Sequence, residues 1–439
     1  MDGGEDKQKS MAANLSASFD GHWLPWMTVL GLGCLAVGIF VSPGVCAGYH
    51  ILLFIPGAWI AFKEFQKHGC NALPSSSWAL LGLVAYGIIA TLANWNELKD
   101  PARSLGKLKY FAMAVLGLFA LRHAARSRVM TQARLRQIAN LFLISIIASV
   151  TYGLVATMAN IDLLTFAPPE GDRTGGFTGT MRFGYGMAMV LVALVGLRLH
   201  TGSSHPCFHQ NLLSWAIGLG AIGLILTQTR GALLGCLCGL PLALYLHRPK
   251  AGIWMGIAST IIASILLIGN ILGEERISRI LTGKSKDIPT RFFRGLEGDQ
   301  RLSLYKAGLK GIQERPLLGH GMIGFPKHIR SIKERYGIAY PDGEASHAHN
   351  TFIDTAANLG LPGLAALLAW LSFWGIESWR RGGCARRCIV PLLVVFIVAG
   401  QFEYYFDANN SFLIFALYSL SHVPDFPADN PVPKVIEQT

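Results

Sequence analysis

The sequence predicts an all-α integral membrane protein with about twelve transmembrane helices and one large, partly helical loop outside the membrane. Three observations predict this fold class. Of the 439 residues, 51% are hydrophobic and only 15% are charged, too few to cover a water-facing surface. Apolar runs of roughly 20 residues, the length that crosses a bilayer as a helix, recur along the chain. One long polar stretch, residues 273–350, interrupts them late.

The apolar runs divide the chain into successive parts. We expect an N-terminal tail over 1–24, transmembrane helices 1–9 over 25–272, the loop over 273–350, transmembrane helices 10–12 over 351–421, and a Pro-rich C-terminal tail over 422–439. The individual spans are expected near residues 25–43, 47–62, 77–94, 108–121, 138–158, 184–199, 212–227, 231–247, 252–272, 351–375, 389–405 and 410–421.

The distribution of Lys and Arg predicts the orientation. The short loops on the side of both tails carry the larger share of basic residues, including Arg380, Arg381, Arg386 and Arg387 after the tenth span. By the positive-inside rule both tails are then cytoplasmic, and the long loop lies on the outer face. The net charge of +12 is therefore attributed to loops that face anionic lipid rather than to nucleic-acid binding. The cysteines lie mostly in apolar runs, so no disulfide or zinc framework is expected.

The long loop contains a helical pattern. In "RLSLYKAGLKGIQERP", Leu302, Tyr305, Leu309 and Ile312 recur at helical spacing, and Pro316 ends the segment. We expect this helix to pack with that apolar face on the membrane domain, as a cap.

Three polar residues far apart in sequence are predicted to meet at the outer membrane face. Arg230 lies in the tight connection "LTQTRGALLG" between two spans, Arg301 opens the loop helix, and His349 in "SHAHNTFID" ends the loop where the tenth span begins. Arginine suits a phosphate because its planar donors match two oxygens at once. The partial positive charge of a helix N-terminus favours a neutral imidazole at His349, the form that a general base needs.

Other polar residues at this face are weaker candidates for substrate binding. Asn350 could orient the ring or the substrate, and His347 is a second imidazole two residues from His349. Arg182, Lys107 and Lys109 stand near the outer ends of their spans, where contact with lipid headgroups would also explain them.

Several alternatives remain open on the residues alone. Arg230 could bind only lipid phosphate, and Arg301 could pair with a neighbouring carboxylate. Short acidic pairs in the loop, Glu297/Asp299 and Asp342/Glu344, could hold a divalent ion, although such pairs are common in polar loops. "GHGMIG" matches a dinucleotide motif in letters only, because no βαβ unit surrounds it.

A lipid-linked pyrophosphate fits such a site. Its tail would stay in the bilayer while its phosphates meet the arginines, which would stabilise the departing diphosphate. The histidine would take the proton of an attacking hydroxyl. No nucleotide, metal or other cofactor is expected.

The motifs "LTQTRGALLG", "RLSLYKAGLKGIQERPLLGHGMIGF" and "HAHNTFIDTAANLGLPGL" resemble the O-antigen ligase and polymerase superfamily. The resemblance covers roughly residues 170–375 by motif, and it is nearest to the O-antigen ligases of lipopolysaccharide synthesis. It implies a GT-C-like fold with about twelve membrane helices and a large periplasmic loop. The family's two arginines and its histidine fall on Arg230, Arg301 and His349, with Thr229 in place of the more usual serine.

The resemblance also implies an activity, partners and a location. O-antigen ligases transfer the glycan from undecaprenyl pyrophosphate to lipid A–core at the periplasmic side of the bacterial inner membrane, without metal and with inversion. O-antigen polymerases and protein O-oligosaccharyltransferases of the same superfamily share this chemistry and differ in the acceptor. A membrane transporter is the alternative from another class, because Gly360, Pro362 and Gly363 interrupt the tenth span.

Overall fold

A computed structural model describes residues 23–127, 129–159, 175–201, 208–272, 300–338, 347–406 and 408–423. Throughout these residues the regular elements are helices. In chain order the helices are α2 (Trp23–Val41), α3 (Pro43–His68), η1 (Gly69–Ala72), α4 (Ser75–Ala93), η2 (Trp95–Glu97), α5 (Pro101–Arg126), α6 (Gln132–Ala159), α7 (Thr180–Thr201), α8 (Gln210–Leu226), α9 (Arg230–Tyr245), α10 (Pro249–Leu272), α13 (Gln300–Glu314), α14 (Phe325–Arg335), α15 (Thr351–Arg381), α16 (Gly383–Ala399) and α17 (Ala408–Ser421).

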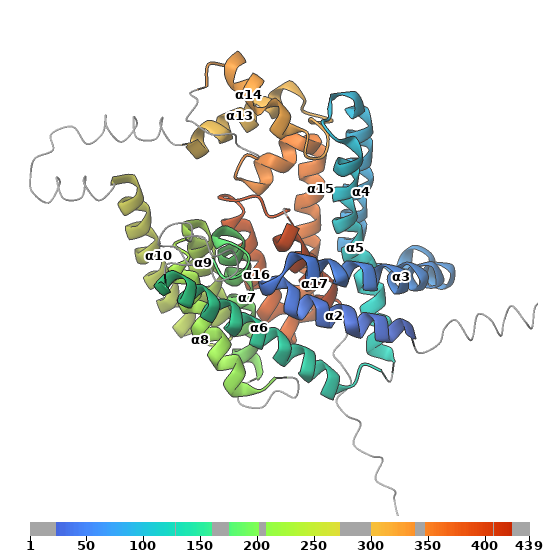
Figure 1. The fold of residues 1–439 in the computed structure, drawn as a ribbon, viewed down its shortest axis with the longest axis vertical. Coiled ribbons are helices and arrows are strands. Elements are labelled where there is room, and N and C mark those ends of the chain that lie inside the picture. The colour runs from blue at the N-terminus through green and yellow to red at the C-terminus, as the bar shows by residue number, and fades with distance from the viewer. Residues whose placement is uncertain are drawn as a thin grey trace, which may run out of the picture.

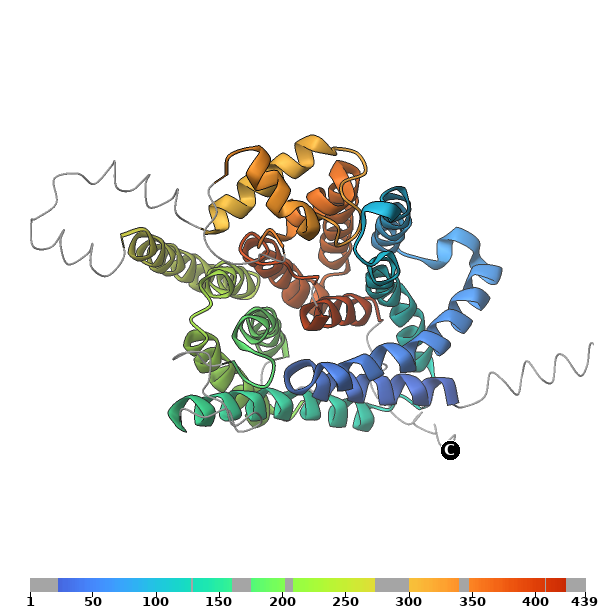
Figure 2. The same ribbon diagram turned by 45° about the horizontal axis from the view of Figure 1, so that its top comes forward.

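The apolar helices pack as a bundle, and two short helices cover one end of it. In the bundle α2 packs on α3, α15 on α4, and α16 on both α7 and α9. Helices α13 and α14 lie against each other beside the first turns of α15 and near α4 (Figures 1 and 2). We call α13, α14 and the turn between them the cap. The predicted helix in the long loop is thus confirmed as α13.

The predicted membrane character is supported by the helices themselves. Seven of the described helices are long and apolar enough to cross a bilayer: α2, α3, α4, α5, α6, α7 and α15. Each of the remaining predicted spans also overlaps an apolar helix, and their crossing of the membrane stays a prediction. Large apolar side chains, such as Ile51, Met158, Trp215 and Trp254, lie exposed on the outside of the bundle, as expected for a surface in contact with lipid.

Helix α15 is broken where the cap meets it. Gly360 adopts φ +68°, and the usual helical bond between the Leu361 amide and the Ala357 carbonyl is replaced by two bonds to the cap. The Leu361 amide donates to the carbonyl of Pro316 (2.7 Å), and the Ala357 carbonyl accepts from the amide of His320 (3.0 Å). The Ala357 carbonyl and the Leu361 amide, which the break separates, are thus both satisfied, and their bonds attach the cap to α15.

The same turn of the cap is also bonded to the end of α4. The Tyr86 hydroxyl donates to the carbonyl of Leu317, and the Met322 amide donates to the Thr91 hydroxyl. Arg315 of the cap pairs with Glu97 just beyond α4, at 2.7 Å. These contacts hold the cap on two neighbouring helices.

The predicted apolar face of α13 is partly wrong. Ile312 packs in the small core of the cap, but the side chain of Leu309 is 51% exposed. The buried face runs instead through Leu304 and the glycines at 308 and 311. These glycines permit a close approach, since a Cβ at Gly308 would lie 2.4 Å from Ile353. Periodicity counts only large side chains, so it missed a face built on glycine.

Some predicted regions lie outside the described residues. These are residues 1–22 and 424–439 of the two tails, and residues 273–299 and 339–346 of the long loop, with the acidic pairs that it contains.

Candidate functional site

The segment that carries the candidate histidine is held at the start of α15. Asn350 is the N-cap residue, and its side-chain oxygen accepts from the amides of Phe352 and Ile353. Its side-chain nitrogen donates to Gln401 at 3.1 Å. Asn350 thus orients the chain that carries His349. Its proposed contact with substrate stays a prediction.

His349 has an uncommon backbone conformation. Its φ is +49°, and only Gln228 and Ile323 among the other described non-glycine residues have a positive φ. Such conformations cost free energy, and they cluster at functional sites where the surroundings enforce them. Here the enforcing contacts are the Asn350 cap and the Tyr305 hydroxyl, which donates to the His349 carbonyl at 3.4 Å.

A buried carboxylate lies between the two candidate imidazoles. Glu403 has one oxygen 3.4 Å from Nδ1 of His349 and the other 3.5 Å from Nε2 of His347. Burial alone would raise the pKa of Glu403, but the hydrogen bond with His349 and the positive charge that both rings carry when they are protonated hold that pKa below its usual value. The carboxylate is therefore ionised at neutral pH.

The connection that carries Glu403 is bonded to the first residue of α15. The Thr351 amide donates to the carbonyl of Gly400, and its hydroxyl donates to the carbonyl of Glu403, both at 2.7 Å. The same hydroxyl accepts from the amide of Tyr405. Glu403 was not among the residues predicted from sequence. The signal that could have found it is an acidic residue in a short connection between apolar helices, on the same predicted face as His349.

Arg301 lies on α13, which contacts the His349 segment through Tyr305. Tyr305, one turn after Arg301, donates its hydroxyl to the carbonyls of both His349 and Gln401. Residues four apart lie on the same side of a helix, so half-buried Arg301 belongs to the side of α13 that faces the His349 segment.

Arg230 is the first residue of α9, and α9 begins beside the Glu403 connection. The chain turns sharply before it, with Gln228 at φ +51°. A Cβ at Gly231 would lie 2.7 Å from the Cβ of Phe402, the neighbour of Glu403. The side chain of Arg230 is exposed, while the backbone next to it packs against the connection that contains Glu403.

The weaker cationic candidates divide into two groups. Arg182 is exposed near the start of α7, where a Cβ at Gly184 would lie 2.9 Å from the hydroxyl of Thr229, so it stands beside the turn that carries Arg230. Lys107 and Lys109 place their ammonium groups 5.8 and 5.4 Å from the centre of the Tyr110 ring. Tyr110 packs on rings of α3 and α17, so these lysines stand where α5 meets those two helices. A substrate role for all three stays a prediction.

The histidine pair and Glu403 could also hold a metal ion. One ligand atom from each of His347, His349 and Glu403 lies within 4.8 Å of the others. Divalent transition metals accept such a set of two imidazoles and one carboxylate. The sequence predicted no metal, and removal of divalent ions tests that prediction directly.

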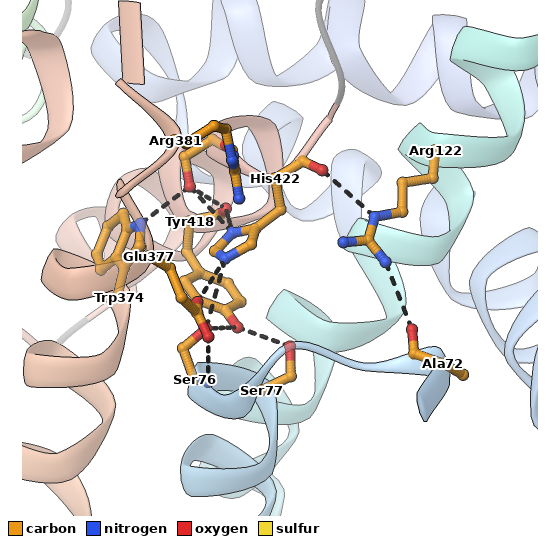
Figure 3. A network of polar contacts seen from close by, with 10 residues as sticks. Ala72, Ser76, Ser77, Arg122, Trp374, Glu377, Arg381, Tyr418 and His422 are labelled. Carbon is orange, nitrogen blue, oxygen red and sulfur yellow. Dashed lines mark hydrogen bonds and ion pairs between the residues drawn. The ribbon is translucent and has the colours of Figure 1, made fainter. Parts of the chain in front are cut away.

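A second polar network lies at the opposite end of α15 (Figure 3). Glu377 accepts from both the amide and the hydroxyl of Ser76 at the start of α4, and it lies 3.0 Å from Nε2 of His422. Serine, histidine and a carboxylate also form nucleophilic triads, but there the carboxylate and the serine hydroxyl contact different ring nitrogens. Here both approach Nε2, while Nδ1 lies 2.9 Å from the carbonyl of Tyr418. The network joins α4, α15 and α17, and it does not activate Ser76.

The chain matches one known family over part of its length. Residues 215–368 match a family model described as O-antigen ligase. The matched stretch runs from α8 into α15, so it includes Arg230, Arg301 and His349 but not Glu403. No curated protein matches the chain. The resemblance to the O-antigen ligase superfamily is thereby confirmed over this stretch of the chain.

Proposed function

We propose that this chain, which matches the O-antigen ligase family over residues 215–368, is an O-antigen ligase of the bacterial inner membrane. It transfers the glycan of an undecaprenyl-pyrophosphate donor to a hydroxyl of lipid A–core at the periplasmic face. The observation that carries the proposal is the meeting of four segments at the cap end of α15. His349 and Glu403 are in contact there, and the segments of Arg301 and Arg230 pack against theirs.

The reaction needs no energy source beyond the donor. The O–H bond of the acceptor breaks as its proton passes to His349, and the oxygen forms a bond to the anomeric carbon. The bond from that carbon to the diphosphate oxygen breaks, and its electron pair leaves with undecaprenyl pyrophosphate. Arg230 and Arg301 offset the negative charge that builds on this leaving group. Attack opposite the leaving group inverts the anomeric carbon.

The position of the polar groups favours an enzyme over a transporter. Transporters bind substrate near the middle of the membrane, at broken helices. At the break in α15 near Gly360, the freed backbone groups form hydrogen bonds with the backbone of the cap. That contact explains the interruption without a transport site.

Reconstitution tests the proposal. Purified full-length protein in liposomes is given lipid-linked O-antigen with one of three acceptors: lipid A–core, a second lipid-linked glycan, or a protein. We expect lipid A–core to gain the mass of the glycan. Growth of the lipid-linked glycan would identify a polymerase, glycosylation of the protein would identify an oligosaccharyltransferase, and no transfer to any acceptor would contradict the proposed function.

A further inference from the structure

We propose that Glu403 is a positioning residue that gives the two imidazoles different roles. It holds His349 with Nε2 free to take the acceptor's proton, and it holds His347 as a fixed support that takes none. The inference rests on the proposed function, which requires one base but does not say which histidine acts.

The role of His347 follows from the backbone N–H group that donates a hydrogen bond to its ring. The backbone amide of His349 donates to Nδ1 of His347 at 3.2 Å. An N–H can bond only to a lone pair, so Nδ1 carries no proton, and the proton of the neutral ring sits on Nε2. Nε2 faces Glu403 at 3.5 Å. Both nitrogens of His347 are thus engaged, and a further proton on Nδ1 would break the bond from His349.

The role of His349 follows from the acceptor that it faces. Its Nδ1 lies 3.4 Å from an oxygen of Glu403, and an ionised carboxylate can only accept. The proton of the neutral ring is therefore on Nδ1, which leaves the lone pair on Nε2, at the far side of the ring from Glu403. This is the tautomer that a general base requires.

The backbone makes this orientation rigid. The Ala348 amide donates to buried Asp354, which in turn accepts from Asn358. With the Asn350 cap and the Tyr305 bond, every residue from His347 to Asn350 makes at least one hydrogen bond. The imidazole of His349 therefore has its reactive orientation before the substrate binds, so the site needs less rearrangement during the reaction.

Proton transfer strengthens the contact with Glu403. When the acceptor's proton reaches Nε2, His349 becomes an imidazolium, and its Nδ1–H bond to Glu403 becomes charge-assisted. Such bonds are shorter and roughly twice as strong as neutral ones. The present 3.4 Å contact fits a catalytic hydrogen bond that tightens during reaction. Glu403 keeps its charge throughout and takes no proton.

A matched pair of substitutions tests the division of roles. Asparagine tolerates the left-handed conformation at 349 better than other residues with a side chain, so His349→Asn removes the ring without straining the backbone. At 347 the asparagine carbonyl can replace Nδ1 as acceptor. We expect His349→Asn to lower kcat by roughly 10²–10⁴-fold, and His347→Asn to keep at least about a tenth of wild-type kcat. Equal losses or the reverse order in folded protein would overturn the inference.

Glu403 has its own pair of substitutions. We expect Glu403→Gln to lower kcat by roughly 10²-fold or more, as happens when a base loses its tautomer, while KM changes little. Glu403→Asp should recover part of the loss, because the carboxylate remains. A purely structural role would instead lower the amount of folded protein and leave the kcat of the remaining protein unchanged, and that result would contradict the proposal.

Nitrogen NMR on the full-length chain with ¹⁵N-labelled histidine gives a readout that does not depend on activity. We expect His349 protonated on Nδ1 and His347 protonated on Nε2, with the His349 preference lost in Glu403→Gln. Protonation of His349 on Nε2, or spectra that change with a chelator because an ion occupies the site, would overturn the inference. If the tautomers are as assigned but no acceptor gains glycan, the proposed function fails instead.

Discussion

The carboxylate of Glu403 lies 3.4 Å from Nδ1 of His349, although the two residues are 54 positions apart in the chain. The contact joins the start of α15 to the connection between α16 and α17. It places a charged acceptor directly behind the imidazole that the proposed reaction uses as its base.

Arg230 is expected to bind two phosphate oxygens at once through its planar guanidinium group, and not only to supply a positive charge. Arg230→Ala should lower kcat by roughly 10²–10³-fold, as loss of a donor to a developing negative charge does elsewhere. Arg230→Lys should be nearly as damaging, since an ammonium cannot bind two phosphate oxygens in one plane. Rates of glycan transfer in liposomes measure both. Arg248→Ala, an exposed arginine just beyond the other end of α9, is the control. Full activity with lysine at 230 would favour simple charge attraction.

Arg301 is expected to contact the leaving diphosphate from α13. Arg301→Ala should reduce transfer by about 10²-fold. Lys306, on the same helix and exposed, provides a matched control that removes an equal charge from the cap. Assays at several donor concentrations separate kcat from KM. Equal effects of the two substitutions would mean that the cap contributes only its overall charge.

Glycan transfer is expected to need no divalent ion. His347, His349 and Glu403 are close enough to hold one, so the prediction is a real test. Protein freed of metal with a chelator, then dialysed, should transfer glycan at the wild-type rate. Activity that disappears with chelator and returns with zinc or manganese would assign these three residues to a metal site. Recovery with calcium or magnesium alone would point to the loop carboxylates.

Gly360 is expected to be essential for docking of the cap. A side chain at 360 would be strained at φ +68°, and its Cβ would lie 1.8 Å from the carbonyl oxygen of Leu317. Gly360→Ala should therefore lower the free energy of unfolding by more than about 2 kcal/mol. Gly375→Ala on the same helix is the control, because its Cβ would make only an ordinary contact, 3.5 Å from Leu393. Thermal unfolding and limited proteolysis of the cap measure the difference, and equal stabilities would contradict it.

The cap is expected to lose stability in acid because of His320. Burial lowers the pKa of His320 to about 4, with smaller effects from His328 and Arg315. An unfolded histidine gains its proton near pH 6.5, so the unfolded chain binds more protons between the two values. Stability contributed by the neutral ring is therefore complete above about pH 6.5 and is lost as the pH falls towards 4, by at most about 3 kcal/mol.

Replacement of His320 by phenylalanine tests this directly. His320→Phe keeps a ring against Phe325 and His328 but cannot take a proton, so the melting temperature should vary less between pH 7 and pH 5. His68→Gln, at an exposed site, should leave the wild-type dependence in place. An unchanged pH dependence in His320→Phe would assign the acid sensitivity to other groups.

The sequence predicted the helices well because their signals are local. Apolar runs set the bundle helices, and Pro316 together with the helical period set α13 to within a few residues. The face of α13 was harder to predict. Leu309 is exposed and the glycines at 308 and 311 are buried, because a close approach to Ile353 and Phe325 depends on where those residues lie.

By itself the sequence determined an apolar helical chain, a break near Gly360, and the polar residues Arg230, Arg301 and His349 at the ends of their helices. Composition and periodicity within a few turns are sufficient for such features. Only the tertiary structure decided that Glu403 contacts Nδ1 of His349. It also decided that the cap forms hydrogen bonds with the backbone groups left without helical partners at Gly360. Those groups are distant in the chain, and their hydrogen bonds can form only when packing of the whole bundle brings the two segments together.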